Sequence, residues 1–490
     1  MLAFLFFLPH LRGAPVGDDW PVFAAVGRAE SAEPLRWLNP LRPGWYRPLS
    51  HAYAALTWRL FGREGAPHRL LGAVLFAATT LAVMRLTVRV SGEPRAGPLA
   101  GLVFATGATH AEPVLWIAAH NELLAGLLAT VSLLAYARYA RTLRGSWLLA
   151  AAGTCCLAVM AKETALGLPL AMASIAALLP ASGAATERAG RGRLRTALPA
   201  LVLAVAAALL VLARSGGGLP YDVSTHPLQL MGNMAFSGAM LLVAVPADGG
   251  LLHASFAPGS RLVAAWPAAA AAAALVGLGI LALRWRAWRG CSSCRRGMGV
   301  AAVVCLAGML PAAAIVTERT AYLPSVGAAM GLGLLLARLH RLAGQRGPPA
   351  VAAVTLLAAA YLLASTTAAQ GRARYWSQAA VTSDAVMSQL AAAARVAPIG
   401  STIVVTELPD RHGPAVLFLN AFPAAAEVWP VPAPVLVTAA APGEGRVVAL
   451  RYDAGPPPRL VPSGGAAPAA TPRPPGGLRS PGRDAVPARP

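Results

Sequence analysis

The chain has 490 residues, of which 56% are hydrophobic and only 12% are charged. A soluble globular protein carries about twice that share of charged residues, and the apolar excess here lies in repeated long runs. The net charge of +21 comes from arginines in short clusters between these runs rather than along one basic face. The composition therefore indicates a polytopic membrane protein and excludes nucleic acid as the main partner.

The first apolar stretch covers residues 1–11 and rises only about 16 Å as a helix, roughly half of the hydrocarbon core. We interpret it as a clipped first transmembrane helix without the basic leader of a signal peptide. A loop rich in Trp, Pro and Arg follows over residues 12–69, and its segment 50–61 is predicted to lie along the interface as an amphipathic helix. The adjacent carboxylates Asp18 and Asp19 open this loop.

The later apolar runs predict about ten further spans, which gives an all-α polytopic domain over residues 1–370 with about eleven transmembrane helices. The spans are expected at residues 69–90, 96–110, 121–138, 147–161, 163–180, 196–213, 262–283, 299–316, 321–337 and 350–368. The weakly apolar stretch 232–245 is placed in an outer loop, as an interfacial or re-entrant segment, because a crossing there would invert everything downstream.

The arginine-rich loops give the orientation by the positive-inside rule. Alternate loops that start at Arg85, Arg138, Arg188, Arg284 and Arg338 carry at least three arginines each, and all fall on one side. We assign that side to the cytoplasm of a bacterial cytoplasmic membrane. Most acidic residues then lie at the extracytoplasmic face, and ionisable groups gathered on one side support a functional site there.

The chain is expected to become soluble after the last span. Residues 371–454 predict a small extracytoplasmic α/β domain with strand-like runs at 402–406, 415–422, 435–438 and 446–450. Residues 455–490 are rich in Pro, Gly, Ala and Arg and are predicted to be disordered.

Asp18 and Asp19 lie immediately outside the first span, where a carboxylate can act as a general base on an acceptor hydroxyl or as a metal ligand. The alternative is that they cap the loop or pair with Arg12 or Arg28. A second group, His110, Glu112, His120 and Glu122, either ligates a metal or hydrogen-bonds around a helix start.

Lys162, the only lysine among 41 basic residues, is followed by Glu163, and as neighbours in a helix the two are expected to have different partners. Lys162 either snorkels to the interface or neutralises a phosphate. Arg319 contacts a phosphate or forms a structural ion pair. Cys291 and Cys294 form a lone CxxC, and we interpret them as ordinary loop cysteines because zinc needs two more ligands.

Together these motifs resemble the GT-C glycosyltransferases over about residues 1–370, and within them the protein O-mannosyltransferase-like branch and its tetratricopeptide-bearing relatives. The resemblance rests on the acidic pair, Tyr46-Arg47-Pro48-Leu49, His110-x-Glu112-x-Val114-x-Trp116-Ile117, Lys162-Glu163 before Leu168-Pro169, and Glu318-Arg319-x-x-Tyr322-Leu323-Pro324-Ser325. The chain departs from these relatives in His120-Asn121-Glu122, where they often carry Gly-Arg-Asp, in Thr320, and in having no tetratricopeptide repeats after the last span.

The resemblance implies a hexosyltransferase of the cell envelope that moves a sugar from a polyprenyl-phosphate donor to a hydroxyl of a protein, lipid or glycan acceptor. Asp18 or Asp19 would be the base, and Arg319 and Lys162 would stabilise the departing lipid phosphate. His110 and Glu112 would shape the second loop. The resemblance implies no certain cofactor, and it leaves open whether a divalent cation is needed.

Two other classes compete with this interpretation. A transporter or flippase for a lipid-linked saccharide predicts charged groups within the spans and an internal repeat. A noncatalytic membrane scaffold would depend instead on its C-terminal domain.

Overall fold

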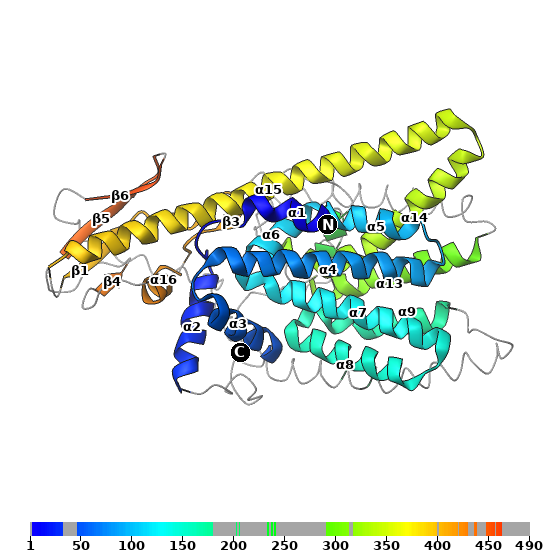
Figure 1. Cartoon of the computed structure of the whole chain (residues 1–490), viewed down its shortest axis with the longest axis horizontal. Helices are drawn as coiled ribbons and strands as arrows, with labels where there is room; N and C mark the ends of the chain where they lie inside the picture. Colours follow the sequence, from blue (N-terminus) through cyan, green and yellow to red (C-terminus); the bar gives the residue numbers. More distant parts are fainter. Residues whose placement is uncertain are drawn as a thin grey trace, which may run out of the picture.

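The computed structural model describes residues 2–32, 47–179, 291–312, 317–398, 401–419, 421–429, 436–438, 447–455 and 457–462, with a few single residues between 202 and 241. Long helices lie side by side in an elongated bundle, and a small sheet lies beyond one end of it (Figure 1). The predicted spans 196–213 and 262–283 and most of the stretch 232–245 lie outside the described residues.

The helices follow the chain in a simple order. They are α1 (Leu2–Phe7), α2 (Asp19–Ala32), α3 (Pro48–Phe61), α4 (Gly65–Ser91), α5 (Ala96–Ala105), α6 (Ala111–Leu115), α7 (His120–Thr142), α8 (Gly145–Ala161), α9 (Leu168–Leu178), α13 (Ser292–Ala312), α14 (Tyr322–Gly344), α15 (Pro348–Val396) and α16 (Phe422–Val428). Short 3₁₀ turns η1 (Leu8–His10), η3 (Ala108–His110), η4 (Ile117–Ala119), η5 (Glu163–Gly167) and η6 (Arg319–Ala321) join several of them.

Five helical segments of the described chain are long and apolar enough to cross a membrane: 65–91, 117–142, 292–310, 319–344 and 348–396. Three shorter apolar helical segments, 96–105, 145–161 and 163–178, accompany them. The protein is therefore a mostly helical, multi-pass membrane protein.

Three parts of the predicted loop 12–69 are helical, and the last of them, residues 65–69, is the start of α4. The predicted interfacial helix 50–61 corresponds to α3, which begins two residues earlier at Pro48. The prediction of loop for residues 19–32 was wrong, because α2 forms there. Pro21 suggests a loop, but it lies in the first turn of α2, where proline costs no intrahelical hydrogen bond.

The last helix is much longer than predicted. α15 continues from the expected span 350–368 to Val396, so the expected domain boundary at residue 370 falls inside it. Beyond the span, its buried residues recur at helical spacing and pack on the bundle and loops; they include Ala369, Arg372, Ala373, Trp376, Ala380, Ser383, Met387 and Leu390. α15 thus connects the bundle to the sheet without a break (Figure 1).

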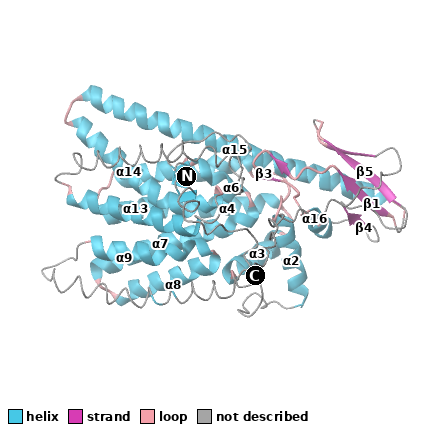
Figure 2. Ribbon diagram, turned by 180° about the vertical axis from the view of Figure 1, so that it is seen from behind, coloured by secondary structure: helices cyan, strands magenta, loops and turns pink. Residues whose placement is uncertain are grey.

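The sheet has the strand order β4 (Leu436–Thr438), β1 (Thr402–Thr406), β5 (Val447–Asp453) and β6 (Arg459–Pro462). β1 pairs in parallel with both β4 and β5, and β6 is antiparallel to β5 (Figure 2). The predicted strand at 402–406 is confirmed.

Three expectations near the C-terminus and in the CxxC motif need correction. The run 415–422 forms only β3 (Ala415–Val416), which pairs with β2 (Arg411–His412), before α16 begins. The segment expected to be disordered from residue 455 contains β6, because its backbone pairs with β5. Cys291 and Cys294 form a disulfide, since the first turn of α13 brings their Cα atoms to 5.4 Å.

Gly327 permits a close approach of α13 and α14. A Cβ atom at Gly327 would overlap the backbone of Cys305 and Ala301, whereas one at Gly331, on the next turn, would meet the Met298 sulfur at an ordinary 3.5 Å. We predict that Gly327→Ala lowers the free energy of unfolding by about 1–3 kcal/mol, the usual effect of overpacking.

The measurement is thermal unfolding of the purified protein in detergent. Gly331→Ala is the matched control and should be neutral or stabilising, because alanine has the higher helix propensity. Equal melting temperatures for both variants would contradict this account of the α13–α14 contact.

Candidate functional site

Charged side chains gather where several loops meet at one end of the bundle. In chain order, the first loop precedes α4, the second precedes α7, the third lies between α8 and α9, and the fourth precedes α14. We call this group the loop cluster; it consists of Asp18, Asp19, Arg47, Arg69, Glu112, Glu122, Lys162, Glu163, Glu318, Arg319 and Arg372. Most of its members are buried, and each is held by contacts that the following paragraphs describe.

Asp19 joins the first loop to the second. Its side chain is fully buried, Oδ2 accepts the N–H of Val16 at 2.9 Å, and Oδ1 accepts the N–H of Ala118 at 2.6 Å. Burial raises the pKa of Asp19 to about 7, although both N–H donors and the Arg69 charge oppose this. Both carboxylate oxygens are thus already engaged by backbone from two loops.

Arg69, in the first turns of α4, ties the same two loops together. Its Nε donates to the Leu115 carbonyl at 2.9 Å, Nη1 to that of Gly13 at 2.8 Å, and Nη2 to that of Ala14 at 2.6 Å. Gly17, with φ of +51°, turns the chain between these carbonyls and Asp19. The buried charges of Asp19 and Arg69 therefore shape one loop junction.

Asp18, the neighbour of Asp19, is exposed to solvent. The surrounding protein still desolvates its carboxyl enough to raise its pKa, while the nearby Arg319 charge works in the opposite direction. The acidic pair thus consists of one buried and one accessible carboxylate.

Arg319 is held on two sides. Its guanidinium lies over the Trp116 ring at 4.6 Å, and Nη1 is 3.3 Å from Glu112 Oε1. Trp116 in turn stacks on Trp376 of α15, with ring centroids 5.3 Å apart. The Arg319 side chain keeps 20% of its surface exposed, whereas that of Glu112 is fully buried. Arg319 is therefore fixed in place with part of its guanidinium accessible.

Lys162 ends α8 in an extended conformation, with φ of −158° and ψ of 138°. The break lets Lys162 Nζ lie 4.0 Å from Glu163 Oε1 as well as 3.6 Å from Glu122 Oε1. The closest partners of Lys162 and Glu163 are different, as expected, but the premise that the two lie in one helix was wrong, and they also contact each other. Arg47 also binds Glu163 through two bonds, of 2.8 and 2.5 Å. Burial lowers the pKa of Lys162 to about 8.

Sequence reasoning missed two arginines of the loop cluster. Arg372 forms a buried ion pair with Glu318, and it comes from the stretch expected to be a separate domain. Arg69 was taken only as the edge of a span. A charge in the first turn of an apolar helix is a usable signal, since ionisable groups at membrane depth are costly.

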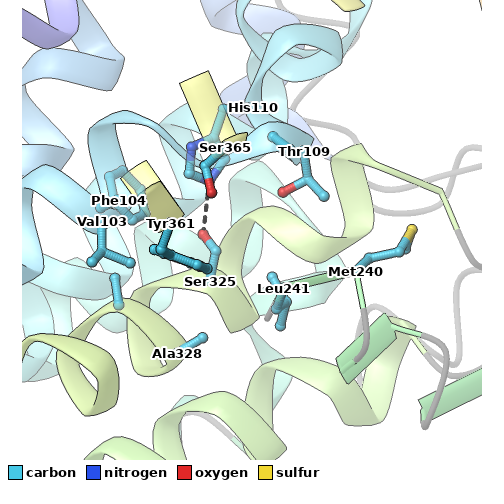
Figure 3. Close-up of a pocket in the computed structure, with 13 residues that line it drawn as sticks. Val103, Phe104, Thr109, His110, Met240, Leu241, Ser325, Ala328, Tyr361 and Ser365 are labelled. Atoms are coloured by element: carbon cyan, nitrogen blue, oxygen red, sulfur yellow. Dashed lines mark hydrogen bonds between the residues drawn. The ribbon is translucent and has the colours of Figure 1, made fainter. Parts of the chain in front are cut away.

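His110 contributes to packing beside the loop cluster. Its Nε2 is 2.9 Å from Ser325 Oγ, and the rings of Phe76, Phe104 and Tyr322 surround it. Burial lowers the pKa of His110 to about 3, so the ring is neutral. It also lines a small cavity of about 20 Å³, which is room for roughly one water molecule (Figure 3).

The glutamates of the loop cluster pair with arginine and lysine. Within the described parts of the chain, no group of three or more His, Cys, Asp or Glu side chains is placed to hold a metal ion.

Comparison with known proteins gives only distant likenesses. No protein-family model matches the chain, and no curated protein matches it. Solved structures of ArnT from Cupriavidus metallidurans are similar over 87% of this chain and 83% of ArnT. The undecaprenyl phosphate-bound form is 15% identical with a TM-score of 0.45, and the apo form is 16% identical with a TM-score of 0.46.

The archaeal oligosaccharyltransferase AglB from Archaeoglobus fulgidus, in complex with an inhibitory peptide and a dolichol-phosphate, is similar over 85% of this chain and 60% of AglB. Its identity is 14% and its TM-score 0.46. We assign no function from likenesses at this level.

The two adjacent aspartates should differ in their effect on folding. At pH 8, above the pKa of Asp19, Asp19→Asn should lower the free energy of unfolding by about 2–3 kcal/mol, because it removes charge-assisted hydrogen bonds from a buried group. Asp18→Asn should change it by less than about 0.5 kcal/mol. Thermal unfolding in detergent measures both, and equal losses would contradict the assignment of Asp19 alone to the loop junction.

Proposed function

We propose that the chain is a membrane glycosyltransferase that moves a sugar from a polyprenyl-phosphate donor to an acceptor hydroxyl at the extracytoplasmic face. The observation that carries the proposal is the accessible Asp18 carboxylate near the fixed, partly exposed Arg319 guanidinium. Such a pair supplies the two groups that glycosyl transfer from a lipid phosphate needs: a base for the acceptor and a cation for the leaving group.

In the proposed reaction, Asp18 takes the proton of the acceptor hydroxyl while the hydroxyl oxygen attacks the anomeric carbon of the donor sugar. The bond between that carbon and the phosphate oxygen breaks, and its electrons remain on the lipid phosphate. Arg319 neutralises this developing charge with its planar guanidinium, which suits phosphate oxygens. A single displacement of this kind inverts the anomeric configuration.

The other candidate residues have supporting roles in this proposal. Glu112 and Trp116 hold the Arg319 guanidinium in one orientation. Lys162 adds positive charge next to Arg319, but only 9% of its side chain is exposed, so Arg319 makes the more direct contact with phosphate. Asp19 positions Asp18, and His110 supports the second loop through packing.

The direct test is transfer from a radiolabelled polyprenyl-phosphate sugar to membrane acceptors at matched amounts of folded protein. Asp18→Asn should reduce the rate by about 10²–10⁴-fold, the usual contribution of a positioned base. Asp410→Asn, an exposed carboxylate on the segment between β1 and β2, is the control and should retain the wild-type rate.

Wild-type transfer with an unaffected Asp18→Asn variant would overturn the assignment of the base. An absence of transfer by the wild type, together with movement of the lipid-linked saccharide across vesicles, would replace the proposal with a flippase.

The pH dependence follows from the same pair. A general base must be deprotonated, so the rate falls as the pH drops through the pKa of Asp18, which burial raises above its usual 3.8. The Arg319 charge lowers this pKa. As the pH falls, the residual activity of Arg319→Gln should therefore be lost at a higher pH than that of Arg319→Lys, because lysine keeps the positive charge. The pH–rate profiles of the two variants measure this difference. Coincident profiles would show that the titrating group does not sense Arg319.

A further inference from the structure

A second charged feature lies at the opposite ends of the helices that begin at the loop cluster. α4 contributes Arg69 to the loop cluster and carries Arg89 near its other end. The 20 residues between them rise about 30 Å, which is the thickness of the hydrocarbon core. α7 runs likewise from Glu122 to Arg141. The two features therefore face opposite surfaces of the membrane.

At this opposite surface, α4, α5 and α7 line an open cavity of about 490 Å³. Four arginines line it, Arg85 and Arg89 from α4 and Arg138 and Arg141 from α7, and the other lining residues are apolar or glycine. A Cβ atom at Gly97 would come within 2.9 Å of the Met84 carbonyl oxygen, so this glycine lets α5 approach α4.

In the described parts of the chain, no carboxylate balances the four arginines. Within the described residues none of them forms an ion pair, and Glu93, at the end of α4, pairs with Arg341 instead. Arg141 donates to the Arg89 carbonyl, and the Arg138 guanidinium lies 4.6 Å from the Trp147 ring centroid. Arg89 Nε is buried and has no hydrogen-bond partner. The cavity thus concentrates positive charge that an anion would stabilise.

We propose that this cavity binds the phosphate headgroup of an anionic membrane phospholipid from the leaflet opposite the loop cluster. Arginines at a membrane surface recognise phosphate through charge-assisted hydrogen bonds. The apolar walls at Met84, Val88 and Leu134 favour a phosphate that carries a glycerol and acyl chains over a soluble ion. The proposal is independent of the proposed transfer reaction, because its test measures lipid binding.

The test is binding of dioleoyl phosphatidylglycerol to the purified full chain in detergent, measured by native mass spectrometry against dioleoyl phosphatidylcholine. The double variant Arg85→Gln with Arg89→Gln should bind the anionic lipid at least about tenfold more weakly, since it removes charge-assisted hydrogen bonds to the phosphate. Arg95→Gln with Arg346→Gln removes the same charge from exposed positions on this surface and is the control.

Leu134→Trp gives a second, charge-neutral route to the same loss by filling the cavity. Preference for phosphatidylglycerol that both cavity variants lose and the control keeps would support the proposal. Equal loss of binding in the control would overturn the proposal, because it would show that general surface charge attracts the lipid. Displacement of the lipid by millimolar inorganic phosphate would also overturn it, because it would show that the cavity binds a soluble anion.

Discussion

The arrangement of the candidate site depends on one buried pair of opposite charges, Asp19 and Arg69. Asp19 takes backbone N–H groups from the first and second loops, and Arg69 donates to carbonyls of the same two loops. Loss of a hydrogen bond to a buried charged group typically costs about 1.5–3 kcal/mol. The first loop also carries Asp18, and the second carries Trp116 beneath Arg319. The pair therefore fixes the base and the cation of the proposed reaction relative to each other.

Around this junction, each glutamate lies next to an arginine or lysine. Because these side chains are largely shielded from solvent, leaving any of them unpaired would be costly. The pairs are Glu112 with Arg319, Glu318 with Arg372, Glu122 with Lys162, and Glu163 with Arg47. Asp18 differs from the other carboxylates of the loop cluster in its exposure to solvent. The network thus supplies a rigid frame in which one accessible carboxylate and one partly accessible guanidinium can meet a substrate.

Apolar runs long enough to cross a bilayer predicted α4, α7 and α14 from the sequence, because their length and composition leave little choice. The continuation of α15 was missed because its second half is an Ala-rich amphipathic helix. A search for long apolar runs does not detect such a helix, so this part was assigned to a soluble domain. The predicted spans 147–161 and 163–180 place a break at Lys162, but Lys162 and Glu163 were still treated as neighbours in one helix, so the extended conformation of Lys162 was missed.

The composition of the loop cluster was partly visible in the sequence. Asp18, Glu112, Lys162 and Arg319 are charged residues at span ends, and the cost of burying charge in a membrane singles them out. The difference between Asp18 and Asp19 was not visible. It arises from the N–H of Ala118, 99 residues away, and such a contact is set by the fold and not by the local pattern.

Binding of the lipid phosphate, separated from transfer, tests the central claim most directly. We would measure the equilibrium binding of a short-chain polyprenyl phosphate to the wild type, Asp18→Asn and Arg319→Gln. If Asp18 is the base and Arg319 contacts the phosphate, Asp18→Asn should bind at least as tightly as the wild type, because it removes a negative charge near the phosphate. Arg319→Gln should bind about tenfold more weakly or worse. Wild-type binding by Arg319→Gln, or loss of binding by Asp18→Asn, would contradict the account.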